Sequence, residues 1–237
     1  MRRAEHLSDD IVLHLGDCRE ILPSVNGVAA VVSDPPYGME YRSGWATDEL
    51  WQEGRTIDGD EDCTARDGML AILPHIGNPP ALIFGRHTLP APIGTKMWLV
   101  WDKGPALGMG DLSLPWKPSF EIIFVIGSGF TGHRGGAVIY CPPVQSMAKN
   151  GRVHPNQKPI DLLGQLIMKC PKGLIADPFM GSGSTGVAAA RAGRPFVGIE
   201  TKQKFFDIAC RRIADELKRP RFALAPETEA SQEALGL

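Results

Sequence analysis

Short apolar runs alternate with amphipathic segments along most of this chain, and polar loops separate them. The runs have the length of strands, and they predict strands over residues 11–15, 28–33, 81–85, 97–101, 120–126, 173–176 and 195–199. Apolar positions at helical spacing predict helices over residues 63–76, 159–169, 187–192 and 202–218. The run VAAVVS is continuously apolar and fits a parallel strand covered on both faces. Strands that alternate with helices predict an α/β fold.

The stretch from Gly173 to Glu200 combines a strand, a glycine-rich loop, a helix and a second strand. The loop, which we expect over residues 177–186, contains Gly181, Gly183 and Gly186. An acidic residue at the tip of the second strand, about 20 residues after the loop, is typical of a Rossmann-like nucleotide site. Glu200 has this position and can accept two hydrogen bonds from ribose hydroxyls. The loop is not a P-loop, because it lacks the Lys-Ser/Thr pair.

A second group of polar residues follows the strand at 28–33, in the sequence Asp34-Pro35-Pro36-Tyr37. Two successive prolines hold the chain extended and supply no N–H donors. The Asp34 carboxylate, the proline carbonyls and the Tyr37 ring therefore suit a planar ligand that bears an NH₂ group. The alternative is a proline turn with a packing tyrosine.

Asp17 follows the strand at 11–15 and precedes a brief helix at 18–22. It either caps this helix or offers a carboxylate at the ligand-binding end of the sheet.

Composition narrows the class of protein further. The 237 residues suit one α/β domain, and 25 basic residues balance 27 acidic ones. Any contact with nucleic acid must therefore come from a local patch. The five cysteines include no C-x-x-C pair, which predicts reduced thiols and no zinc site, and the histidines show no metal-ligand spacing. The polar start and the lack of a long apolar run predict no signal peptide and no membrane partner.

The segment 127–158 contains Arg134, Lys149, Arg152 and Lys158 and no acidic residue. We interpret it as a small target-recognition insertion, with Arg134, Lys149 and Arg152 on phosphates and Gln145, Ser146 or Asn150 near base edges. The alternative is a solvated loop. We read residues 39–62 as a mobile loop over the site and residues 219–237 as a flexible tail.

Three motifs together resemble the beta class of DNA amino-methyltransferases that use S-adenosylmethionine. Asp34–Tyr37 resembles their DPPY catalytic motif, DPFMGSG at 177–183 resembles their cofactor loop, and HPNQKP at 154–159 resembles the segment before that loop. Gly16-Asp17 resembles a short motif ahead of DPPY. The order of the motifs also matches. Protein-glutamine methyltransferases with a related PPY motif carry the cofactor loop first.

The resemblance implies a single catalytic domain over residues 1–237 with a Rossmann-like methyltransferase fold. The sheet is expected to be mostly parallel and seven-stranded, with helices on both faces and a circularly rearranged motif order. The strand before Asp177 is expected beside the strand before Asp34.

The resemblance also implies a site and a cofactor. Catalysis is expected at Asp34, Pro35, Pro36 and Tyr37. S-adenosylmethionine is the implied cofactor: Asp177 and the backbone at 181–183 hold its methionine end, Phe179 and Asp17 flank its adenosine, and residues 154–158 close the pocket. The full set of predicted cofactor residues is Asp17, Cys18, Asp34, His154, Asn156, Lys158, Asp177, Phe179, Gly181, Ser182, Gly183 and Glu200.

The implied reaction is methylation of N6 of adenine in a flipped-out base of double-stranded DNA, because Asp stands first in the PPY motif. The alternatives are N4 of cytosine, a DNA-binding subunit without turnover, and an enzyme acting on RNA or a small molecule. A bacterial, archaeal or phage-infected cytoplasm is the expected location. A homodimer and a cognate restriction nuclease stay open.

Overall fold

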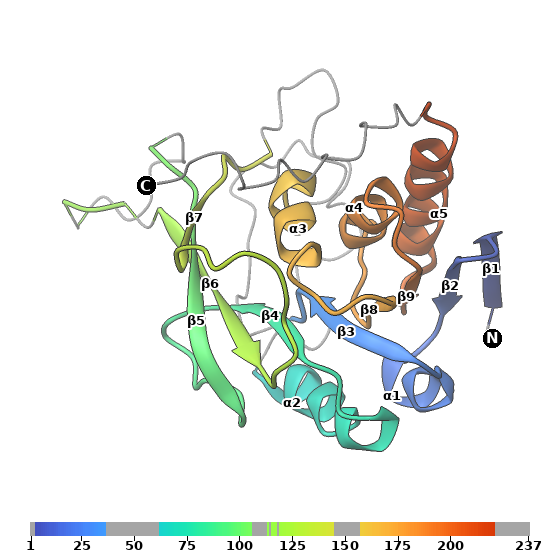
Figure 1. Ribbon diagram of the computed structural model, residues 1–237, viewed down its shortest axis with the longest axis horizontal. Helices are drawn as coiled ribbons and strands as arrows, with labels where there is room; N and C mark the ends of the chain where they lie inside the picture. Colours follow the sequence, from blue (N-terminus) through green and yellow to red (C-terminus); the bar gives the residue numbers. More distant parts are fainter. Residues whose placement is uncertain are drawn as a thin grey trace, which may run out of the picture.

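A single mixed sheet forms the centre of the molecule (Figure 1). The computed structural model describes residues 3–36, 62–105, 113, 115–117, 119–144 and 157–220. Within these residues nine strands pair in the order β1-β2-β9-β8-β3-β4-β6-β5-β7. They are β1 (Arg3–Ser8), β2 (Ile11–Leu15), β3 (Val28–Ser33), β4 (Ala81–Gly85), β5 (Thr95–Asp102), β6 (Phe120–Ile126), β7 (Val138–Tyr140), β8 (Leu174–Asp177) and β9 (Phe196–Glu200).

Helices cover both faces of this sheet (Figure 1). One face carries α1 (Cys18–Ile21), the 3-10 helix η1 (Leu22–Ser24), α2 (Thr64–Leu70) and the 3-10 helix η3 (Leu73–Ile76). The other carries α3 (Ile160–Ile167), α4 (Ser184–Arg191) and α5 (Gln203–Leu217). A separate apolar core fills each interface. In the described part of the chain, no helix has the length and apolar character needed to cross a membrane.

The prediction of seven strands was wrong, because the described residues contain nine. The two additional strands lie at opposite ends of the sheet. β1 is mostly exposed and pairs antiparallel with β2, while β7 has three residues and pairs parallel with β5. Edge strands of this kind form through backbone hydrogen bonds to one neighbour. They need no apolar pattern, so the sequence shows no run at either place.

Two predicted helices differ from the structure by more than one or two residues at an end. The helix expected over 63–76 ends at Leu70 and resumes as a 3-10 turn at Leu73. Pro74 explains the break, since it lacks an N–H and its ring would clash with the carbonyl of Leu70. The helix expected from 187 begins at Ser184, because Gly183 has a left-handed conformation (φ 81°) and ends the loop there.

The strand before Asp34 (β3) was expected to lie beside the strand before Asp177 (β8), and the structure confirms this. β3 pairs parallel with β8, and Val31 faces Ala176 in the register. From β3 the chain continues to β4 on one side, whereas from β8 it continues to β9 on the other. The connecting helices α2 and α4 lie on opposite faces (Figure 1). β3 and β8 thus flank a topological switch point, where α/β sheets bind ligands beyond the carboxyl ends of the strands.

Candidate active site

A buried hydrogen bond joins the ends of β3 and β8. The Ser33 hydroxyl donates to Asp177 Oδ1 at 2.6 Å, and the Phe179 backbone N–H donates to the same oxygen at 3.2 Å. Burial raises the pKa of Asp177 to about 6, although hydrogen bonds from Ser33, Thr185 and Phe179 act in the opposite direction. Asp177, at the end of β8, is therefore hydrogen-bonded to the end of β3 as well. The sequence did not indicate Ser33, which only tertiary contact brings to this carboxylate.

Hydrogen bonds with two side chains and close packing on α5 hold the glycine-rich loop in place. The Gly181 N–H donates to Glu200 Oε2 at 3.0 Å. The Arg212 guanidinium on α5 donates to the carbonyl oxygen of Ser182 at 2.6 Å and to its hydroxyl at 2.9 Å. Gly183 packs directly on α5, since a Cβ atom built there would lie 2.8 Å from the Cβ of Ala209. These contacts fix the loop conformation before any ligand arrives.

Glu200 and Asp17 lie at neighbouring strand ends. Besides Gly181, the Glu200 carboxylate accepts the Lys202 N–H at 2.8 Å, and burial raises the pKa of Glu200. Asp17 accepts the Arg19 backbone N–H at 2.8 Å, which confirms that it caps α1, and it pairs with the Arg19 side chain at 2.5 Å. Cys18 is buried in the core beneath. A ribose contact for Glu200 and an adenosine contact for Asp17 stay predictions.

Asp34 is the most unusual group at the site. Its Oδ2 accepts a hydrogen bond from Lys158 Nζ at 2.6 Å, whereas its buried Oδ1 has no partner among the described residues. Burial raises the pKa of Asp34 to about 6, and nearby carboxylates add to the effect, although Lys158 opposes it. Pro35 is buried and Pro36 half-buried beside it. Asp34 therefore has one oxygen bound by Lys158 and one buried oxygen whose acceptor capacity no described residue uses.

Lys158, predicted as a cofactor residue, contacts Asp34 in the structure. Its ammonium also pairs with Glu121 Oε1 at 2.9 Å and lies 4.9 Å from the centre of the Phe84 ring. Burial alone would lower the pKa of Lys158, but the two carboxylates outweigh it and raise the pKa. The sequence reading missed Glu121 and Phe84. A single acid inside the apolar run FEIIFVI was the available indication for Glu121.

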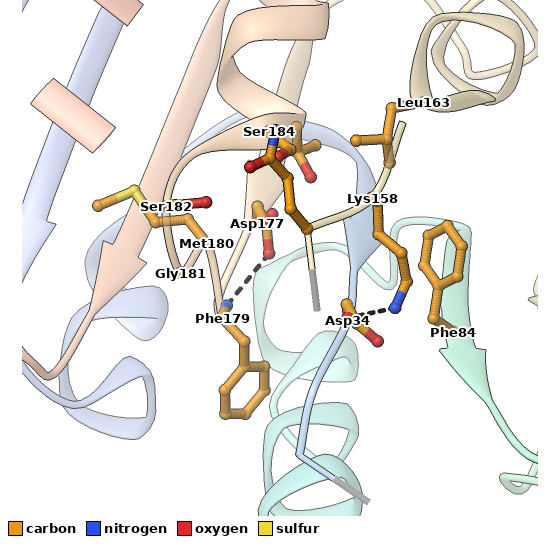
Figure 2. A pocket seen from close by; sticks show the side chains of 12 residues that line it. Asp34, Phe84, Lys158, Leu163, Asp177, Phe179, Met180, Gly181, Ser182 and Ser184 are labelled. Carbon is orange, nitrogen blue, oxygen red and sulfur yellow. Dashed lines mark hydrogen bonds and ion pairs between the residues drawn. The ribbon is translucent and has the colours of Figure 1, made fainter. Parts of the chain in front are cut away.

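One pocket brings the two motif regions together, and Figure 2 shows Asp34 and Lys158 facing Asp177 and Phe179 across it. The empty space in it is about 420 Å³, part of which is open solvent. Of the predicted residues, the lining includes Asp34, Lys158, Asp177, Phe179, Gly181 and Ser182. Pro35, Pro36, Asp17, Cys18, Gly183 and Glu200 do not line it, although Glu200 bonds to Gly181, which does.

Several predicted residues lie outside the described part of the chain. They are Tyr37, Lys149, Arg152, His154 and Asn156, together with Gln145, Ser146 and Asn150. The loop expected over the site, residues 39–62, and the expected tail fall almost wholly there as well. Arg134 is described: it is exposed, follows β6 and does not line the pocket.

The fold is a methyltransferase-type α/β fold, as comparison with solved structures shows. The chain superposes on the crystal structure of the M1.HpyAVI–SAM complex with a TM-score of 0.60 and 20% identity, over 86% of this chain and 98% of that one. It also superposes on PvuII DNA methyltransferase (cytosine-N4-specific), with a TM-score of 0.57 and 13% identity, over 89% of this chain and 92% of that one. These matches confirm the predicted Rossmann-like methyltransferase fold.

Sequence comparison is more specific. Residues 97–211 match the N6_N4_Mtase family, described as DNA methylase. Type II methyltransferase M2.DpnII of Streptococcus pneumoniae is 46% identical over 65 residues, which are 27% of this chain. The match spans about a quarter (24%) of that relative. The predicted resemblance to S-adenosylmethionine-dependent DNA amino-methyltransferases is confirmed.

Proposed function

We propose that this protein methylates N6 of adenine in double-stranded DNA, with S-adenosylmethionine as the methyl donor. The observation that carries the proposal is the Asp34 Oδ1 atom. It is a buried acceptor with no partner among the described residues, and Asp34 lines the same pocket as the glycine-rich loop. Such an atom costs free energy unless a ligand donates to it. An exocyclic amino group is a suitable donor.

The residues around the pocket fit S-adenosylmethionine. The cofactor supplies an electrophilic methyl group on a sulfonium. Asp177 and the backbone at 181–183 would hold its methionine end, and Glu200 would accept from its ribose hydroxyls. Phe179 lines the pocket, and its ring would contact the adenine of the cofactor. The loop is already fixed by Glu200 and Arg212, so little ordering would accompany binding.

Asp34 is the residue that would activate the base. The lone pair of an exocyclic amino nitrogen is delocalised into the ring, so this nitrogen is a poor nucleophile. Hydrogen bonds accepted by Asp34 Oδ1 and the Pro35 carbonyl would localise the lone pair and stabilise developing positive charge. Tyr37 would stack on the base, a contact worth about 1–3 kcal/mol. The amino group is unreachable inside a duplex, so the base must be flipped out.

DNA is the substrate that the sequence relatives favour, and residues 127–158 are the proposed recognition insertion. The choice of adenine as the target base depends on Asp34, which stands at the first position of the motif. The geometry of the acceptors suits either amino base, and the PvuII enzyme has the same fold with the other specificity. We further propose a cytoplasmic setting and a role in restriction-modification, with a cognate nuclease and a homodimer as the partners to test.

The deciding experiment is nucleoside analysis by mass spectrometry. Double-stranded DNA incubated with the protein and S-adenosylmethionine should yield N6-methyladenine. N4-methylcytosine alone would overturn the choice of base. Cofactor binding without any methylated nucleoside, in DNA or in RNA, would favour a DNA-binding subunit without turnover.

Glu200→Ala should weaken binding of S-adenosylmethionine about 10- to 100-fold. The reason is the loss of a charged hydrogen-bond pair to the ribose, worth about 1.5–3 kcal/mol. Calorimetric titration measures the change. Glu216→Ala on α5, which removes a carboxylate paired with Arg191, should leave the affinity unchanged. An unaltered affinity in Glu200→Ala would contradict the assignment of the ribose site.

Replacing Arg134, Lys149 and Arg152 together by alanine should flatten the dependence of DNA affinity on salt. Each lost phosphate contact should reduce the slope of log affinity against log salt by up to about 0.9. Fluorescence anisotropy at several salt concentrations measures the slope. A control triple variant of exposed cations outside the segment, at Lys172, Lys204 and Arg211, should keep it. If both triple variants behave alike, the DNA does not contact the segment 127–158.

A further inference from the structure

Four alternating charges form a continuous chain of ion pairs that starts at Asp34. Lys158 Nζ lies 2.6 Å from Asp34 Oδ2 and 2.9 Å from Glu121 Oε1, and Lys103 Nζ lies 2.8 Å from Glu121 Oε2. The two inner side chains are the most buried, with 8% exposure for Lys158 and 10% for Glu121. The members come from β6, from the segments after β3 and β5, and from the segment before α3. Only the tertiary fold assembles them.

Glu121 controls how Lys158 distributes its hydrogen bonds. An ammonium has three donors, and a buried cation that keeps fewer partners becomes costly. With Glu121 present, Lys158 divides its donors between two carboxylates, and the Phe84 ring faces the same ammonium. Without the charge of Glu121, Asp34 is the remaining anion in contact with Lys158 among the residues that the structure describes. The ammonium would then be drawn onto both oxygens of Asp34 and would occupy Oδ1.

We propose that Glu121 is a positioning residue for methyl transfer, which holds Lys158 on Oδ2 of Asp34 so that the buried Oδ1 keeps its acceptor capacity for the amino group. The identity of that amino group rests on the proposed function. The charge arrangement does not depend on it. Glu121 acts through Lys158 and does not touch the substrate.

The charges around Asp34 predict how the pKa of Asp34 changes when the charge of Glu121 is removed. Lys158 lowers the pKa of Asp34, whereas burial, Glu121 and Asp177 raise it to about 6. Removing the charge of Glu121 removes one of the repulsions, so the pKa of Asp34 should fall. A residue without electrostatic contact with Asp34 would leave this titration unchanged. Glu121→Asp keeps the charge with one methylene fewer and should keep the pKa near that of the unmodified protein.

The test compares Glu121→Gln and Glu121→Asp with a matched control. Glu216→Gln also removes a carboxylate held by two cations, Arg191 and Arg219, and its side chain is 9% exposed. NMR titration of the Asp34 carboxyl carbon, without DNA or cofactor, should give a lower pKa in Glu121→Gln alone. The maximal rate of methylation should fall about 10- to 100-fold in that variant, with the affinity for S-adenosylmethionine retained.

An unchanged Asp34 titration in Glu121→Gln overturns the proposal, and so does an unchanged maximal rate. If Glu121→Gln does not fold, the proposal can still be tested by NMR on the unmodified protein. The Lys158 ammonium resonance should follow the Asp34 titration, and a resonance that does not respond also overturns the proposal. If the unmodified protein methylates no nucleic acid, the proposed function fails, while the two titrations still decide the role of Glu121.

Discussion

Asp34→Asn should reduce the maximal rate of methyl transfer about 1,000-fold and leave binding of S-adenosylmethionine largely intact. An amide has one oxygen where the carboxylate has two. Lys158 lies 2.6 Å from Oδ2 and would bind that oxygen, so the NH₂ group would occupy the place of Oδ1. A donor would then face the amino group of the base in place of an acceptor. The loss should therefore appear in the chemical step.

Single-turnover methylation and calorimetric cofactor binding separate the two effects. Asp161→Asn makes the same chemical change on the exposed face of α3, where Asp161 is 85% exposed, and should keep full activity. The ionised form of Asp34 is the acceptor, so the rate in the unmodified protein should rise with pH through about 6. A rate in Asp34→Asn within tenfold of the unmodified protein would show that another group activates the base.

Gly183→Ala should destabilise the protein by about 3 kcal/mol and lower its melting temperature by roughly 6–12 °C. Two independent costs add here. The φ of 81° is left-handed, which a side chain disfavours, and the added Cβ would lie 2.8 Å from the Cβ and 3.0 Å from the Cα of Ala209. The backbone of α5 would have to move, and Arg212, which holds the loop, would move with it.

Gly164→Ala provides the matched control for this prediction. Gly164 lies inside α3, and an added Cβ would meet no atom within 4 Å. Alanine favours a helix interior over glycine, so this variant should gain about 0.5–1 kcal/mol. Thermal denaturation of both variants measures the difference. Equal melting temperatures would show that α5 does not pack on the loop as closely as the structure indicates.

Some features of this protein are encoded by short segments of sequence, and others arise only from tertiary contacts. The sequence predicted most strands, the glycine-rich loop and the Asp34 motif. Each of these depends on contiguous residues with a definite period or turn chemistry. Edge strands β1 and β7 were not predicted, since backbone pairing with a neighbour creates them. The helix at 63–76 was misjudged where Pro74 acted against an otherwise regular apolar spacing.

By itself, the sequence determined the α/β class, the two motif loops and the acceptor at Asp34, because these are properties of short segments. The tertiary structure decided which side chains complete the site. Ser33 reaches Asp177 across 144 residues, and Lys158 reaches Asp34 across 124. No local period encodes such contacts; parallel pairing of β3 with β8 and the position of β6 beyond β4 create them. A buried lysine requires anionic partners, and only the assembled sheet supplies them. Lys158 therefore pairs with both Asp34 and Glu121.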